Sequence, residues 1–320
     1  MHARAPSIVA VALLASLSAC EKSSPGKGAP ASEAALWKLL PASSTVVFGG
    51  NYLKLQRFMT DSALGKATRA MGTSVSAGMK DWIDCFVGIQ GVDVVGAVSI
   101  GARGGDMRMV MTGVSPAQIT TCAGKAGFKV SPAPDGKFLS VDVPSPAGTH
   151  SQGYLQVAGG ALYTRQGVAL GGGAPAITPA TRAELEADVA AAATASVTTN
   201  AALQALIAKA DRSKTMWFAG SAAGTPIADK LGEVYGALDL DHGVAADVTA
   251  QVLDAQLASQ AEQGIQQAKQ SVDALPAEVR DVVRGLELSR AGDRLRLKLT
   301  ITDARSEERR VGKECLRLCR

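Results

Sequence analysis

The chain has 320 residues, with 33 Lys and Arg against 29 Asp and Glu, and a formal net charge of +4. Hydrophobic residues make up 47% and aromatic residues only 4%, so small aliphatic side chains must form most of the core. This length and composition exclude an intrinsically disordered chain and one too short to bury a sizeable core.

The first 20 residues have the three parts of an export signal. A basic start is followed by an apolar segment at 7–17, which is shorter than the ~20 residues that span a bilayer. The segment ends in Leu17-Ser18-Ala19-Cys20, which resembles the lipobox of bacterial lipoproteins. That resemblance implies removal of residues 1–19 and attachment of lipid to the Cys20 thiol. Several acyl chains would then hold the protein durably on a membrane.

Residues 20–33 are small, polar and rich in Pro and Gly, which predicts a flexible tether. Glu21 stands where an Asp commonly retains such proteins at the inner membrane. We therefore expect a cell-envelope protein, held by its lipid anchor at the outer rather than the inner membrane.

The first predicted unit, residues 34–199, alternates helical and strand patterns. Its turns GARGG, PAPDG and GG separate apolar runs and predict three hairpins. Ser115-Pro116 predicts a helix start. The expected helices are 31–40, 61–70, 74–84, 115–125 and 179–193. The expected strands are 43–49, 93–100, 106–112, 127–130, 137–143, 153–157 and 161–165.

The second predicted unit, residues 200–304, repeats this order. Its expected helices are 200–210, 226–233, 254–273 and one after Pro276. Its expected strands are 214–219, 234–240, 244–252 and a hairpin within 285–301. Three blocks match in sequence order: 44–49 with 214–219, 94–100 with 234–240, and 127–143 with 285–301.

These matches predict an internal duplication. The fold class is then α+β, with two duplicated units, each an antiparallel sheet with helices packed on one face. Leu40-Pro41-Ala42 before the first strand resembles the opening motif of uncharacterised Gram-negative envelope lipoproteins. The resemblance covers the whole body and implies a duplicated α+β fold with no known activity.

Residues 305–320 do not resemble the end of a domain. The stretch RSEERRVGKEC can be back-translated into a common sequencing adapter read in frame, so we interpret 305–320 as adapter-derived. The signal holds one basic residue and this tail holds six basic and three acidic ones, which leaves 26 of each sign. That neutral remainder gives no signal for nucleic acid as a partner. A genuine basic tail would instead favour nucleic acid or anionic lipid.

The cysteines reduce to one pair in the body. Cys20 is the predicted lipidation site, and Cys315 and Cys319 lie in the tail. In an oxidising compartment the remaining Cys85 and Cys122 predict a disulfide, with two buried free thiols as the alternative. Their spacing is not that of a metal site, and we expect no metal and no cofactor.

Other chemistry-bearing residues have simpler interpretations. Asp239, Asp241 and His242 could bind a hard cation, but Asp-His-Gly is ordinary turn chemistry. His150 lacks a recognisable nucleophile motif. The glycines at 171–173 lack a following Lys-Ser/Thr and predict a loop. Trp37, Trp82 and Trp217 are expected in the core or an interface. The helix at 254–273 has an apolar stripe that includes Leu253 and Leu257 and is expected to pack on the sheet.

No catalytic residue is predicted, so the sequence favours a non-enzymatic envelope lipoprotein that acts as a binding or structural module. A carrier of an apolar ligand such as a lipid is the first alternative, and an enzyme of unrecognised type is the second. The expected partners are the membrane, through the anchor, and an envelope protein or apolar ligand. A large apolar cavity would favour the carrier, and a cleft with converging ionisable groups would favour the enzyme.

Overall fold

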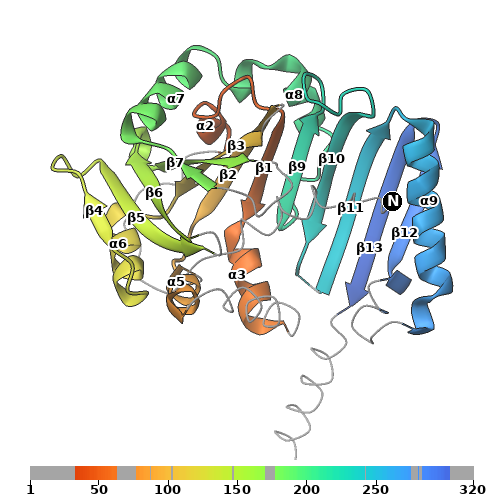
Figure 1. Cartoon of the computed structure of the whole chain (residues 1–320), viewed down its shortest axis with the longest axis horizontal. Coiled ribbons are helices and arrows are strands. Elements are labelled where there is room, and N and C mark those ends of the chain that lie inside the picture. Colours follow the sequence, from red (N-terminus) through yellow and green to blue (C-terminus); the bar gives the residue numbers. More distant parts are fainter. Residues whose placement is uncertain are drawn as a thin grey trace, which may run out of the picture.

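The computed structural model describes residues 33–302, apart from 63–76, 87, 102–103, 146–147, 170–176, 242, 275–279 and 281–282. Within these ranges the chain forms one antiparallel sheet with helices on both faces (Figure 1). The mixed α+β class predicted from the sequence is therefore confirmed, but the expectation of helices on only one face of each sheet was wrong for the first half, where buried clusters lie under helices on both faces. The described helices include none that is both long and apolar enough to cross a membrane. The predicted signal, tether and tail lie outside the described residues.

The sheet has 13 strands and joins both halves of the chain. Its order is β12-β13-β11-β10-β9-β1-β2-β3-β7-β6-β5-β4, and β8 adds to β7. The central pair, β1 and β9, is antiparallel and places Phe48 opposite Phe218. The strands are β1 Val46–Asn51, β2 Asp93–Gly101, β3 Gly104–Thr112, β4 Val130–Pro132, β5 Phe138–Ser145, β6 Gly148–Gln156, β7 Leu162–Ala169, β8 Ile177–Pro179, β9 Met216–Ser221, β10 Leu231–Asp239, β11 Gly243–Val252, β12 Leu286–Ala291 and β13 Arg294–Thr302.

The helices lie on both sides of this sheet (Figure 1). Short 3-10 turns occupy Ala158–Gly160, Val197–Thr199 and Val272–Ala274. The α-helices are α2 Glu33–Trp37, α3 Tyr52–Asp61, α5 Ala77–Phe86, α6 Pro116–Lys125, α7 Arg182–Thr194, α8 Ala201–Ile207 and α9 Ala255–Gln270.

We call face A the side of the sheet that carries Val47, Tyr163 and Trp217. These side chains share one buried cluster with residues of α2, α7 and α8, which cover face A from β6 to β10. Trp37 of α2 meets Trp217 edge to face, with ring centroids 5.8 Å apart. The cover ends at β10, so face A of β11, β13 and β12 has no helix over it among the described residues.

Face B is the opposite side, which carries Phe48, Met111 and Leu162. Helices α5 and α6 pack here against β3, β5 and β7, and Trp82 lies in this cluster. Helix α3 covers a corner formed by Leu238, Leu240 and Val244. Helix α9 packs near the far edge (Figure 1), where Ala258 contacts the cluster of Val252 and Leu295.

Several predicted elements are confirmed. The three predicted hairpins of the first half are present as β2–β3, β4–β5 and β6–β7. Helix α6 begins at Ser115 with a capping box, because the Ser115 side chain accepts from the Gln118 amide and Gln118 accepts from the Ser115 amide. Trp37, Trp82 and Trp217 are all buried.

Other predictions were wrong. A helix was expected at 226–233, but 222–230 forms turns and β10 begins at Leu231. Helix α3 was not predicted, because it starts directly after β1 with Asn51 as both strand end and N-cap. On α9 the small residues Ala258 and Ala261 pack on the sheet, whereas Leu257 is 40% exposed, and Leu253, which precedes the helix, is 48% exposed. Most of 61–70, and the helix after Pro276, lie outside the described residues.

Candidate functional site

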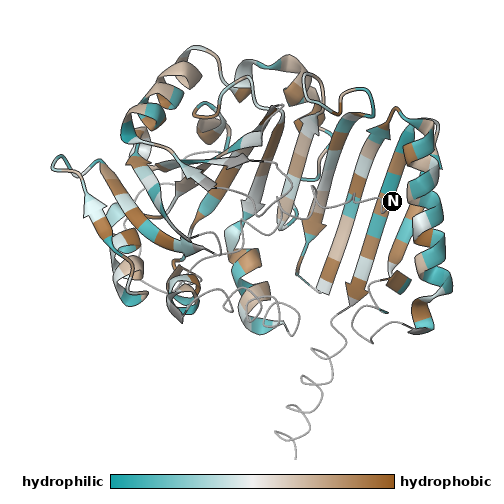
Figure 2. Ribbon diagram, in the orientation of Figure 1, coloured by the Kyte–Doolittle hydropathy of each residue, from teal (hydrophilic) through white to brown (hydrophobic). Residues whose placement is uncertain are grey.

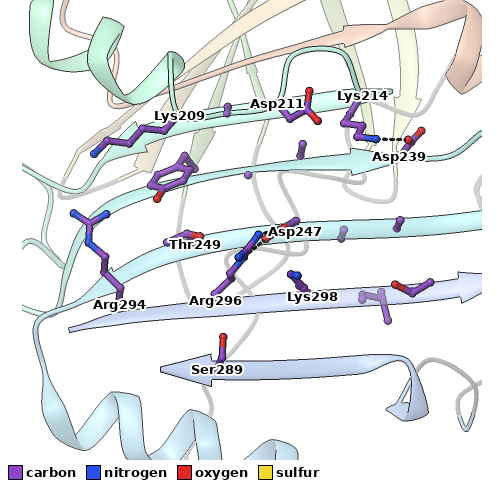
Figure 3. A pocket seen from close by; sticks show the side chains of 18 of the residues that line it. Lys209, Asp211, Lys214, Asp239, Asp247, Thr249, Ser289, Arg294, Arg296 and Lys298 are labelled. Carbon is purple, nitrogen blue, oxygen red and sulfur yellow. Dashed lines mark hydrogen bonds and ion pairs between the residues drawn. The ribbon is translucent and has the colours of Figure 1, made fainter. Parts of the chain in front are cut away.

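A groove of about 920 Å³, lined by charged side chains and small apolar residues, lies on face A where the helical cover ends. Its floor consists of β10 and β11, and one wall consists of β13 (Figure 3). The other wall is the segment after α8, which carries Lys209, Asp211 and Lys214. The volume falls within the range of ~300–1,000 Å³ typical of ligand sites in proteins.

Strand register explains why these side chains share one face. Tyr235, Thr249, Arg296 and Ser289 stand opposite one another across β10, β11, β13 and β12. Side chains alternate between faces along each strand, so residues two apart in β13 (Arg294, Arg296 and Lys298) project into the same groove. The intervening Leu295, Leu297 and Leu299 face the other side. Figure 2 shows this alternation as brown and teal bands along β11 and β13.

Ion pairs hold the acidic groups on the floor. Arg296 donates to both oxygens of Asp247, at 2.8 and 2.5 Å. Hydrogen bonding from Arg296 keeps the pKa of Asp247 below its usual value. Lys214 binds Asp239 at 2.9 Å. Burial alone would raise the pKa of Asp239, but the hydrogen bonds from Lys214 and the Asp241 amide, together with the charges of Lys214 and Lys54, outweigh burial and lower the pKa. Both floor carboxylates therefore stay charged at neutral pH.

The two walls are joined at one end of the groove by Glu233. Its carboxylate binds Lys209 at 2.7 Å and Arg294 at 3.4 Å. The Lys209 ammonium also lies 5.5 Å from the centre of the Tyr235 ring. The Glu233 carboxylate thus binds two cations, and the Lys209 ammonium lies over the ring of Tyr235 on the floor.

Lys298 differs from its neighbours. Among the described residues, no carboxylate lies within ion-pair distance of its ammonium group, although the charge of Asp247 acts on it. Asp247 of β11 and Glu287 of β12 stand opposite Lys298 on its two sides, but the Asp247 oxygens are bound by Arg296 and Glu287 does not lie within ion-pair distance. Lys298 therefore offers hydrogen-bond donors that no described side chain takes up.

The groove mixes donors, acceptors and one aromatic ring. Arg296 and Lys298 donate, Asp247 accepts, and the hydroxyls of Thr249 and Ser289 do both. A hydroxyl-rich ligand needs such a set, because each hydroxyl both donates and accepts hydrogen bonds. An acyl chain would leave these polar groups without partners, which is costly.

Comparisons with known proteins give no functional assignment. No family model and no curated protein matches the chain. Among solved structures, crystal forms I, III and IV of TP0453 align with 84%, 83% and 84% of this chain and 94%, 94% and 93% of that chain. The identities are 12%, 11% and 12%, and the TM-scores are 0.44, 0.43 and 0.39. Likeness at this level supports no conclusion about function.

The two body cysteines lie together, as predicted. Cys85 of α5 and Cys122 of α6 form a disulfide-compatible pair with Cα atoms 5.2 Å apart. Both side chains are buried in the cluster beneath β3 and β5 on face B. The pair ties two helices together and lies far from the groove in the sheet order. Cys20, the other predicted site residue, lies outside the described residues.

The carboxylates of the candidate cation site at the turn after β10 each form an ion pair with a different lysine. Asp239 binds Lys214, and Asp241 binds Lys54 of α3 at 2.6 Å. His242 and the glycines at 171–173 lie outside the described residues. His150 of β6 keeps its Nδ1 buried without a hydrogen-bond partner in the described structure. No group of three or more potential metal-binding side chains occurs among the described residues.

A smaller hollow of about 190 Å³ lies beside α2 and the ends of β1 and β2. Burial raises the pKa of Glu33, although the nearby Arg212 opposes the shift, and burial also raises the pKa of Asp93. Arg212 binds Glu33 at 3.4 Å and lies 5.3 Å from the centre of the Trp37 ring. These contacts fix the start of α2 on the body.

The sequence contained only part of the signal for the groove. The alternation of charged and apolar residues at 294–301 is the local pattern of a strand with one solvent-facing side. The second wall could not be foreseen, because Lys209 and Lys214 are more than 80 residues away from Lys298 in the sequence. Only the pairing of β10, β11 and β13 brings these segments together.

Proposed function

We propose that this protein is a non-enzymatic, lipid-anchored binding module of the bacterial cell envelope, and that its groove binds a hydroxyl-rich ligand such as a glycan. The observation that carries the proposal is the open groove on face A. Its floor alternates hydrogen-bond donors, acceptors and the ring of Tyr235.

This composition favours a glycan over the apolar ligand of a lipid carrier. Both hollows described above are lined by charged groups. In the groove the acidic groups have lowered pKa values and are held in ion pairs. A general acid needs a raised pKa near the working pH, so these carboxylates suit ligand binding better than proton transfer.

We also propose that the body arose by duplication, which explains why the groove is open. Phe48 packs over Gly96 of β2, and Phe218 packs over Gly236 of β10. From the central pair outward, each half continues with a matching strand order. The first half has an additional hairpin, β6–β7, and helix α7. The second half has no counterpart of these among its described elements, so its face A is left uncovered.

The anchor is tested by lipid labelling. Cys20→Ala should abolish incorporation of a labelled fatty acid and leave the signal uncleaved by the lipoprotein peptidase. Cys85→Ala is the matched control, because it removes a cysteine that the lipidation machinery does not recognise. Labelling of the Cys20→Ala chain would contradict the anchor.

The groove is tested by removing one ion pair as a unit. Asp247→Ala with Arg296→Ala removes a donor and an acceptor from the floor without changing net charge. Exposed pairs contribute only ~0–1 kcal/mol to stability, so the double variant should fold. Its affinity for a short oligogalacturonide, either as the free acid or as the methyl ester, should fall by about tenfold or more.

The matched control removes the exposed pair Arg182 and Glu186 on α7. It makes the same chemical change away from the groove and should leave affinity unchanged. If the unaltered protein binds neither form of the oligogalacturonide, or if both double variants lose affinity equally, the glycan groove is wrong.

A further inference from the structure

We propose that the groove contains an anion subsite centred on Lys298, so that the glycan it takes is an acidic one. This inference rests on the proposed function and specifies the chemistry of its ligand. Lys298 lies at the middle of the groove wall, and Figure 3 shows it beside the Asp247–Arg296 pair and facing the same hollow.

The charges around Lys298 explain why an anion would bind there. The floor acids are each bound by one cation of the groove: Asp247 by Arg296 and Asp239 by Lys214. At the end of the groove, Lys209 and Arg294 share Glu233. Lys298 stands between Asp247 and Glu287 in the ladder, yet neither carboxylate lies within ion-pair distance, and among the described cations that line the groove it is the one without an ion-pair partner.

The spacing of the cations along β13 indicates how a linear ligand would lie in the groove. Arg294, Arg296 and Lys298 are two residues apart, so their Cα atoms are spaced by ~7 Å along the strand. A linear chain with anionic groups on successive units can run along this row while its sugar rings lie over Tyr235 and Thr249. Charged hydrogen bonds are stronger than neutral ones, so the anion would set the orientation of the ligand.

An acidic glycan fits this groove better than an acidic peptide or a single-stranded nucleic acid. The hydroxyls of Thr249 and Ser289 and the floor acid Asp247 suit a ligand that also donates hydrogen bonds. One aromatic ring, already contacted by Lys209, offers little stacking area for successive bases.

The experiment compares two forms of one oligosaccharide. A short oligogalacturonide carries a carboxylate on each sugar, and full methyl esterification removes that charge while retaining the hydroxyls. Affinities are measured by calorimetry with the full chain at low and physiological ionic strength. The protein should bind the free acid about tenfold more tightly than the ester. The preference should shrink as salt shortens the Debye length to ~8 Å.

Three variants assign that preference to the subsite. Lys298→Gln should bring the acid-to-ester ratio close to one without weakening binding of the ester. Lys298→Arg keeps the charge and should keep the ratio. Lys125→Gln, at an exposed position on α6, is the matched control for net charge and should also keep it.

The outcomes separate the two proposals. Equal binding of acid and ester, or a Lys298→Gln variant with an unchanged ratio, overturns the anion subsite and leaves the glycan groove intact. Binding of neither form overturns both. Tighter binding of a polyglutamate or an oligonucleotide of equal charge than of the acid glycan would also overturn the inference, because the ligand class would be wrong.

Discussion

Arg108 of β3 donates to Asp188 of α7 at 3.1 Å, and both side chains are almost excluded from solvent. The network continues outward. Arg165 binds Asp106 at 3.0 Å and Asp188 at 3.5 Å, and the Tyr163 hydroxyl donates to Asp188 at 3.3 Å. Helix α7 otherwise buries only Leu185 and Ala192. Charge pairing, rather than a broad apolar face, therefore fixes α7 on face A.

Removing Asp188 should destabilise the protein severely. Asp188→Ala would leave the buried guanidinium of Arg108 without its main partner, and such a loss typically costs ~3–5 kcal/mol. Urea unfolding measures the change. Glu186→Ala, on the exposed side of the same helix, should change the free energy of unfolding by less than ~1 kcal/mol. Equal effects of the two substitutions would show that the network does not hold α7.

The Cys85–Cys122 pair should be oxidised in the exported protein and important for stability. The cysteines are 37 residues apart, so a crosslink shortens a long loop in the unfolded chain. Loss of a native disulfide typically costs ~2–5 kcal/mol. The double variant Cys85→Ala with Cys122→Ala should show this loss in urea unfolding. Thiol labelling of the unreduced, denatured protein should modify neither cysteine; labelling of both would contradict the bond.

The local parts of this fold could be predicted from sequence because their signals are local. Ser115 and Pro116 mark the start of α6 within three residues, and the glycine-rich turns separate strands that pair with their neighbours in sequence. Helix α9 shows the limit. Periodicity identified the helix, but Ala258 rather than Leu257 faces the sheet, and that choice depends on how closely two backbones approach.

The groove depends on pairings that no local pattern encodes. Its floor acid Asp247 and its wall cation Lys298 come from strands separated by α9 and the segment that follows it. Whether a charged residue lines a site or simply faces solvent is decided by the tertiary fold.

Gly96 should be intolerant of a side chain. A Cβ at this position would overlap the ring of Phe48, which packs across the neighbouring strand. Overpacking of this kind typically costs ~1–3 kcal/mol. Gly96→Ala should therefore lower the midpoint of urea unfolding. Gly124→Ala is the control, because nothing lies within 4 Å of its Cβ position and it sits in a helix. That substitution should stabilise by ~0.5–1 kcal/mol. A neutral Gly96→Ala would mean that the ring of Phe48 moves aside freely.

His150 should make the protein less stable in mildly acidic solution. Burial lowers the pKa of His150 from 6.5, and its buried Nδ1 has no hydrogen-bond partner among the described residues. At a pH between the pKa of His150 in the unfolded chain (6.5) and its lower pKa in the folded chain, the unfolded chain therefore binds a proton more readily than the folded chain. The stabilising contribution is complete above about pH 6.5. It is lost as the pH falls through this window, before the paired carboxylates Asp239 and Asp247 begin to titrate.

The measurement is the difference between two proteins, which cancels the other titrating groups. Urea unfolding of the unaltered chain and of His150→Gln is compared from about pH 7.5 down to pH 5. The unaltered chain should lose more stability over this range than the variant does. Parallel curves would place His150 in a solvated environment and contradict the burial. A steeper loss in the variant would mean that the pKa of His150 is raised in the folded protein. In that case the unaltered chain would gain stability from His150 as the pH falls, and the variant would lack this gain.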